Sequence, residues 1–186
     1  MMLEELFKNG KEKMEKAITQ LKKEFAQVRT GRANPIMLDK VMIDYYSVPT
    51  PLRQISQVSV QDGTILVISP YDKTIIKEIE KALIKADLGV QPNSDGMVVR
   101  LSFPPLTAEK RKETTKEVKK IAEESKVAIR NIRRDMTDDL KKIEKDENLS
   151  EDVVKDNQDK IQKLTDSYIK NIDTLASEKE KEVLTV

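Results

Sequence analysis

Residues 103–146 read FPPLTAEKRKETTKEVKKIAEESKVAIRNIRRDMTDDLKKIEKD, and this stretch decides the fold. From residue 106 to its last residue the chain contains neither glycine nor proline. Within this stretch, seam positions recur at intervals of three and four, which is typical of one buried face of a long α-helix. They are Val118, Ala122, Ser125, Ile129, Ile132, Met136 and Ile143. Thr107 can cap this helix, and about forty residues at 1.5 Å each predict a rod roughly 60 Å long.

Two further segments show the same helical spacing and flank the chain at either end. In residues 1–29 the seam runs through Phe7, Met14, Leu21 and Val28, with Ile18 and Phe25 between them. Lys11 occupies one of its positions, so we expect weak packing in the first two turns. After a break at residues 148–150 a third helix restarts at Ser150. Its seam is Val154, Ile161, Leu164, Tyr168, Ile172 and Leu175. No single helix can bury such a stripe alone, so the three predict a helical bundle.

A stretch of different composition lies between the first and second helices. Residues 33–103 hold five of the seven prolines and three of the five glycines. Short runs at 41–46, 57–60, 65–69 and 97–103 are typical of strands, and residues 74–88 of an amphipathic helix. The predicted fold class is α+β: a long three-helix bundle (residues 1–30 and 105–186) with an inserted small α/β domain (31–104). The chain crosses between them at residues 29–32 and 103–106, which we interpret as a two-strand hinge.

The composition excludes several classes of function. The chain has no cysteine and no histidine, so it has no thiol nucleophile, catalytic imidazole or zinc site of the usual ligands. Carboxylate and Mg²⁺ chemistry remain open, but no acidic cluster suggests them. The N-terminal residues lack the pattern of a signal peptide, and the longest apolar run is residues 65–68. We therefore expect a soluble, cytoplasmic, monomeric protein that is not an enzyme, without catalytic residues, metal or cofactor.

Net charge is only +1, yet the second helix separates its charges by face. On a helical wheel, eight cations fall within roughly a third of the circumference, with Glu123 as the main acidic interruption. This basic stripe consists of Lys112, Lys116, Lys119, Lys126, Arg130, Arg133, Arg134 and Lys141. Arginine can grip phosphate with two hydrogen bonds and stack on a base. The stripe fits an RNA-contacting face, a solvated face or a protein partner.

Other signals are weaker and leave alternatives open. Arg29 and Arg32 flank Gly31 at the first crossing. They are either functional charges or ordinary charges that cap the end of the helix. Tyr45 and Tyr46 offer rings that can stack on bases, although the alternation of the run favours one ring in the core. A helical adaptor that binds proteins and a Mg²⁺-dependent enzyme are the competing functional classes.

Several motifs, in order along the whole chain, resemble the bacterial ribosome recycling factor family. They are VRTGRANP (28–35), YY (45–46), PTPLRQ (49–54), ADLG (86–89), PNS (92–94), FPPLT (103–107), VAIRNIRRD (127–135), SED (150–152) and QKLTD (162–166).

The resemblance implies an L-shaped molecule of tRNA-like outline. It also implies binding to the post-termination ribosome and splitting of its subunits with elongation factor G and GTP, which releases mRNA and tRNA. Contact with large-subunit rRNA is expected through the arginine-rich helix, without membrane association. The candidate RNA-binding residues are Arg130, Arg133, Arg134, Lys126, Lys119 and Asn131, although Asn131 points away from the stripe on the wheel. The candidate hinge residues are Arg29, Thr30, Gly31, Arg32, Pro104 and Pro105.

Overall fold

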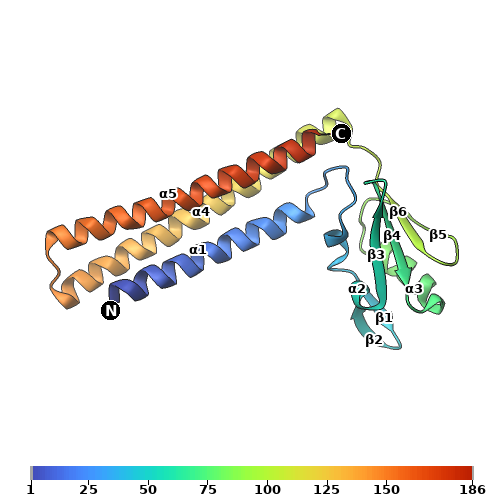
Figure 1. Ribbon diagram of the computed structural model, residues 1–186, viewed down its shortest axis with the longest axis horizontal. Helices are drawn as coiled ribbons and strands as arrows, with labels where there is room; N and C mark the ends of the chain where they lie inside the picture. Colours follow the sequence, from blue (N-terminus) through green and yellow to red (C-terminus); the bar gives the residue numbers. More distant parts are fainter. Residues whose placement is uncertain (1, 186) are drawn as a thin grey trace. The chain divides into compact units, whose positions relative to one another are not determined.

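The computed structural model describes residues 2–185, which divide into two compact units (Figure 1). The helical unit comprises the described residues up to 25 together with residues 115–182. The α/β unit comprises residues 26–114 and the described residues from 183 onward. Among residues 2–185, no helix combines the length and apolar character needed to cross a lipid bilayer.

Three long helices form the helical unit: α1 (Met2–Gln27), α4 (Ala108–Glu147) and α5 (Glu151–Leu184). They lie side by side, with α4 running back along α1 and α5 returning (Figure 1). The predicted cap of α4 is confirmed, because the Lys110 backbone N–H donates to the Thr107 hydroxyl at 3.2 Å. The turn between α4 and α5 uses Asn148 in the left-handed region, at φ 49°. Asparagine tolerates this conformation better than most residues.

The seams of α4 and α5 are buried largely as predicted, and that of α1 is shifted at its start. Val118, Ile129 and Met136 of α4 are buried, as are Ile161 and Ile172 of α5. The structure adds buried positions that the seams omitted: Leu140, Asn157, Thr165 and Ala176.

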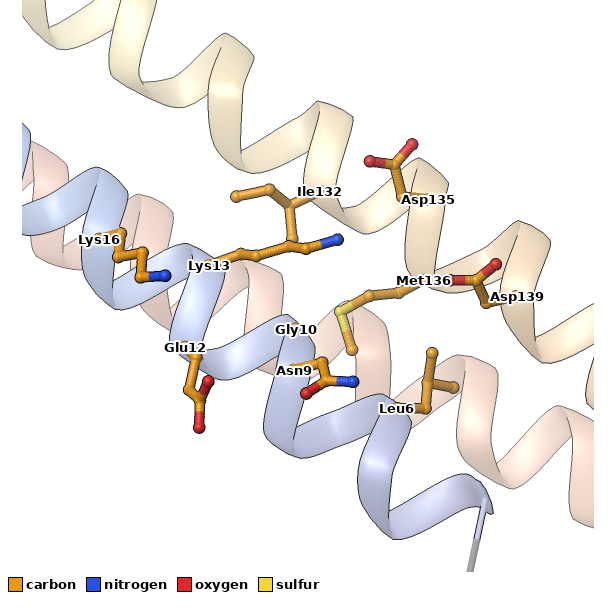
Figure 2. Close-up of a pocket in the computed structure, with 10 residues that line it drawn as sticks. All are labelled: Leu6, Asn9, Gly10, Glu12, Lys13, Lys16, Ile132, Asp135, Met136 and Asp139. Carbon is orange, nitrogen blue, oxygen red and sulfur yellow. The ribbon is translucent and has the colours of Figure 1, made fainter.

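The expectation that Lys11 lies in the α1 seam is wrong. Lys11 is exposed and Gly10 is buried in its place. Met136 of α4 lies over Gly10, and Figure 2 shows its thioether reaching the α1 backbone. A Cβ on Gly10 would overlap the Met136 sulfur, so glycine permits this close approach.

The α/β unit contains two antiparallel sheets. The smaller sheet pairs β1 (Met42–Tyr45) with β2 (Val48–Pro51). The larger has the order β3-β4-β6-β5, and its strands are β3 (Ser56–Gln61), β4 (Ile65–Pro70), β5 (Pro92–Ser94) and β6 (Val99–Ser102). The helical elements are η1 (Pro35–Leu38), α2 (Leu52–Ile55), η2 (Lys73–Ile75) and α3 (Ile76–Lys85).

Alternating side chains of the central strands build the core of this unit. Leu66 and Ile68 of β4 and Val99 and Leu101 of β6 are fully buried, and they cluster with Ile79 of α3. The four predicted strand regions are confirmed with shifted ends, and the predicted helix is shorter than expected. β2, β5 and α2 were not predicted from the sequence. Prolines at the second and last positions of β2 and at the start of β5 hid their extended character.

Candidate RNA-binding surface

The basic stripe lies along α4, and its members differ in how accessible they are. Lys119 and Arg134 are exposed, whereas Lys126, Arg130 and Arg133 are half-buried. Asn131 is also exposed. The stripe is therefore a graded surface. Three of its cations are set against the helices, and five are open to solvent: Lys112, Lys116, Lys119, Arg134 and Lys141.

Two of the half-buried cations are paired with carboxylates. Lys126 Nζ lies 2.5 Å from Asp173 of α5, and only 20% of the Lys126 side chain is exposed. Arg130 donates to Glu123 at 3.0 Å, two turns earlier on α4. Lys126 thus joins α4 to α5, and Glu123 neutralises Arg130 in the unbound protein.

Arg133 has a neutral partner on the neighbouring helix. Its guanidinium donates to Gln162 Oε1 of α5 at 3.2 Å, and Gln162 Nε2 donates to Asp166 at 2.8 Å. As a member of an RNA-contacting stripe, Arg133 was expected to be exposed. This expectation is wrong, because the residue is half-buried. The side chain is oriented by α5, which fixes the direction of its donors without removing its charge.

Arg133 and Arg134 open onto a surface groove between α4 and α5. Its lining is Arg133, Arg134, Thr137, Asp138, Gln158, Ile161 and Gln162, here called the α4–α5 groove. Four of these residues come from α4 and three from α5. Two guanidinium groups against one carboxylate give the groove a positive balance.

The candidate hinge residues lie in the α/β unit. Gly31 has φ 80°, and a Cβ there would sit 3.4 Å from the Leu106 backbone nitrogen. The two crossing segments are thus in close contact at this glycine. Arg32, Pro104 and Pro105 are exposed, and Arg29 and Thr30 are half-buried.

Both crossing segments are hydrogen-bonded to the same turn, the one between β3 and β4. The Ala33 N–H donates to the Gly63 carbonyl at 2.9 Å, and the Phe103 N–H donates to the Thr64 carbonyl at 2.8 Å. Arg29 lies against the loop after α3, with its guanidinium 3.6 Å from where a Cβ on Gly89 would be. The crossings are therefore anchored within the α/β unit.

The two adjacent tyrosines divide as the alternation predicted. Tyr45 packs partly against the core and Tyr46 is 75% exposed, with their rings edge to face. The Tyr46 hydroxyl donates to Asp72 at 3.4 Å. Hydrogen bonds from Thr74 are the main cause that lowers the pKa of Asp72, so this carboxylate stays charged as an acceptor.

A second cavity lies between α1 and α4, with a volume of about 230 Å³. Figure 2 shows Lys13 pointing toward α4, where Asp135 and Asp139 lie one turn apart. Across residues 2–185, no group of three or more metal-ligating side chains converges.

The arginines of this surface were predictable from the sequence, but the α5 side of the surface was not. Gln158, Gln162 and Asp173 are uncharged or acidic, so a search for basic residues passes over them. Gln162 lies in the QKLTD motif, which marked the segment without assigning it a role. Only the packing of α5 against α4 brings these side chains to the stripe.

Comparisons with known proteins agree on one family. A family model described as ribosome recycling factor matches residues 21–184. Relatives named ribosome-recycling factor include a Bacillus subtilis protein, 53% identical over 185 residues and covering 100% of both chains. Another, from Caldicellulosiruptor saccharolyticus, is 55% identical over 177 residues, covering 95% of this chain and 96% of the relative.

Solved structures give the same result. A solution structure of the ribosome recycling factor matches with a TM-score of 0.81 and 37% identity, covering 100% of this chain and 99% of the other. A second match has a TM-score of 0.69 and 43% identity and covers both chains completely. It is described as models for the T. thermophilus ribosome recycling factor and the E. coli elongation factor G bound to the E. coli post-termination complex.

Proposed function

Because this chain belongs to the ribosome recycling factor family, we propose that it recycles ribosomes after termination. It binds the post-termination ribosome and, with elongation factor G and GTP, separates the subunits. Messenger RNA and tRNA are then released for a new round of translation. The full-length match to a factor bound with elongation factor G on a post-termination complex carries this proposal.

The basic stripe is the proposed contact with large-subunit rRNA. Arg134 and Lys119 are exposed and have no ion-pair partner in the described part of the chain, so they can reach phosphates without breaking an internal pair. Arg133 contributes a guanidinium already oriented by Gln162. Arg130 contributes only if it exchanges Glu123 for phosphate, and Lys126 acts by joining α4 to α5. Exposed Asn131 is a peripheral contact.

We assign the chain a mechanical role without catalytic residues. Hydrolysis of GTP belongs to elongation factor G, and this protein, a translation factor of the cytoplasm and not an enzyme, converts that partner's movement into force on rRNA. Phosphate contacts fix the register and orientation of the helical bundle on the ribosome. The chain acts as a monomer and needs no cofactor.

The proposed hinge consists of Arg29, Thr30, Gly31, Arg32, Pro104 and Pro105. Two chain segments cross there, so bending is restricted to a preferred path. The contact between Gly31 and Leu106 supports this role, since the φ of 80° that glycine adopts readily lets the first segment turn beside the second. We propose that the inserted domain, residues 31–104, swings relative to the bundle of residues 1–30 and 105–186 when elongation factor G acts on it.

The decisive experiment is disassembly of purified post-termination ribosomes, followed by light scattering or gradient sedimentation. The protein, elongation factor G and GTP are present together or omitted one at a time. Loss of intact ribosomes only when all three are present is the expected result. Intact ribosomes in the complete reaction, with a factor G from the same source, would contradict the proposal.

A further inference from the structure

Beyond the line of cations, the α4–α5 groove offers several distinct polar groups side by side. Its volume is about 500 Å³, within the size range of pockets that hold one small ligand or one base. We propose that this groove binds a single unpaired nucleotide of rRNA, with Gln158 and Gln162 of α5 as parts of the site. The inference rests on the proposed function and extends it, because it names the form of RNA that the surface recognises.

The guanidinium of Arg133 is the proposed platform for the base. It is half-buried and held by Gln162, which is itself held by Asp166. These bonds also fix which end of the Gln162 amide faces Arg133, since the oxygen must accept and the nitrogen must donate. An arginine plane fixed in this way can stack on an unpaired base with little further loss of side-chain entropy. Gln162 is therefore a positioning residue.

Arg134 is the proposed phosphate contact. It follows Arg133 directly in α4, is exposed, and has no hydrogen-bond or ion-pair partner within residues 2–185. Both arginines line the same groove, Arg133 half-buried and Arg134 exposed, so both guanidinium groups are available to one nucleotide there. The Arg134 guanidinium can bind the phosphate while the Arg133 guanidinium stacks on the base.

Gln158 is the proposed contact with the edge of the base. It lies one helical turn before Gln162 on α5, so both amides face the groove. Its amide is exposed and has no partner in the part of the chain that the structure describes. A side-chain amide can donate and accept at once, which matches the edge of an unpaired base. Asp138, whose carboxylate lies 3.9 Å from Lys141, can accept from an exocyclic amino group.

An unpaired nucleotide fits these groups better than a duplex does. Double-stranded RNA is recognised across broad, shallow surfaces through its backbone, which needs cations and no amide-lined concavity. A duplex would touch the exposed cations and leave Gln158 without a role. Binding of an unpaired nucleotide should therefore depend on the neutral residue Gln158 of α5, whereas binding of a duplex should not.

The first test is equilibrium binding to purified large ribosomal subunits over a range of salt concentrations. Gln158→Ala is expected to bind about three- to tenfold more weakly, as for one lost hydrogen bond. The slope of log affinity against log salt should stay at the wild-type value, because no charge is removed. Asn171→Ala is the matched control, an exposed amide on another face of α5, and it should bind like wild type. Equal affinities of these two variants would overturn the proposal.

A second test concerns the positioning role of Gln162. Gln162→Ala and Arg133→Ala are each expected to weaken binding, and the double variant should be no weaker than Arg133→Ala alone. Such non-additivity is expected when one residue acts only through the other. Independent, additive losses would remove Gln162 from the positioning role.

A third test identifies the ligand directly. A photoreactive benzoylphenylalanine at position 158 is expected to cross-link to an unpaired nucleotide of rRNA in the large subunit. Cross-links only to a base-paired segment, or only to a ribosomal protein, would overturn the proposal. Wild-type disassembly activity is measured alongside. An active wild type with Gln158→Ala indistinguishable from Asn171→Ala removes this inference alone, whereas an inactive wild type removes the proposed function.

Discussion

Tyr168 of α5 shows how a single polar contact is held inside the helical unit. Its hydroxyl donates to Glu15 of α1 at 2.5 Å, and the ring is buried. Burial, with the hydrogen bond to Glu15, raises the pKa of Tyr168 to about 12. Helical spacing predicted that Tyr168 faces the bundle. It could not identify a partner 153 residues away, because that pairing depends on how the helices align.

Replacement of Tyr168 by phenylalanine should lower the free energy of unfolding by about 1–2 kcal/mol at neutral pH. The folded pKa lies above the unfolded value near 10, so the hydroxyl's contribution is complete below pH 10 and is lost toward pH 12. Urea unfolding of wild type and Tyr168→Phe should therefore give a constant difference up to pH 10 that shrinks above it. Tyr71→Phe, at a 74% exposed ring, is the control. A difference that grows above pH 10 would contradict the assignment.

Arg134 carries a prediction about charge at the ribosome. Arg134→Gln should weaken binding to large ribosomal subunits and reduce the salt slope by about 0.7–0.9, as for one lost phosphate contact. Binding measured from low to physiological salt gives both quantities. Lys170→Gln removes an exposed charge from α5, outside the α4–α5 groove, and should leave the slope unchanged. An equal drop in both variants would mean that net charge matters and the position does not.

The long helices were predictable as elements because their information is local. A cap at Thr107, spacing of three and four, and an uninterrupted run without glycine or proline determine α4 from its own residues. β5 was not predictable in this way. Its Pro92-Asn93-Ser94 run is extended only because β6 pairs with it. The same holds for the candidate site. Its arginines can be recognised from the sequence of α4 alone, whereas the groove forms only when α5 packs against α4.

The packing of α1 against α4 at Gly10 can be tested by substitution. Gly10→Ala places a methyl group against the Met136 thioether, which must shift, so the shift should offset part or all of the gain of about 0.5–1 kcal/mol from alanine's better helix propensity. In a Met136→Ala background the obstacle is gone, and the same change should stabilise the protein by the full amount, about 0.5–1 kcal/mol. Denaturant unfolding of the four proteins measures this difference. An equal gain in both backgrounds would refute the contact.

The whole molecule comprises two units, and the α/β unit has a hydrophobic core of its own. Leu66 lies fully buried in that core. Leu66→Ala should therefore destabilise the α/β unit by about 2–5 kcal/mol. Native-state hydrogen exchange should show the loss in β3, β4 and β6, with amides of α5 between residues 151 and 182 unaffected. Uniform loss of protection throughout the chain would mean that both units unfold as one.

The proposed hinge is testable in the complete protein. Proline cannot adopt the φ of 80° found at Gly31, so Gly31→Ala is the suitable change. Alanine strains the backbone at this positive φ, at a cost of about 1–2 kcal/mol, while its Cβ would lie in ordinary contact with the Leu106 nitrogen at 3.4 Å. We expect subunit splitting to slow more than ribosome affinity falls, as measured by disassembly rates and equilibrium binding. A parallel fall in both would leave the hinge without support.

The anchoring of both crossing segments to one turn also bears on how the chain folds. Ala33 and Phe103 are hydrogen-bonded to the adjacent residues Gly63 and Thr64. Once the α/β unit has folded, it therefore holds together the two points where the chain enters and leaves it. The entropy of closing a loop rises with its length, and contacts between α1 and α4 otherwise span the entire insert. Folding the insert first shortens that loop to a few residues. A long-range helix pairing then has nearly the kinetics of a local hairpin.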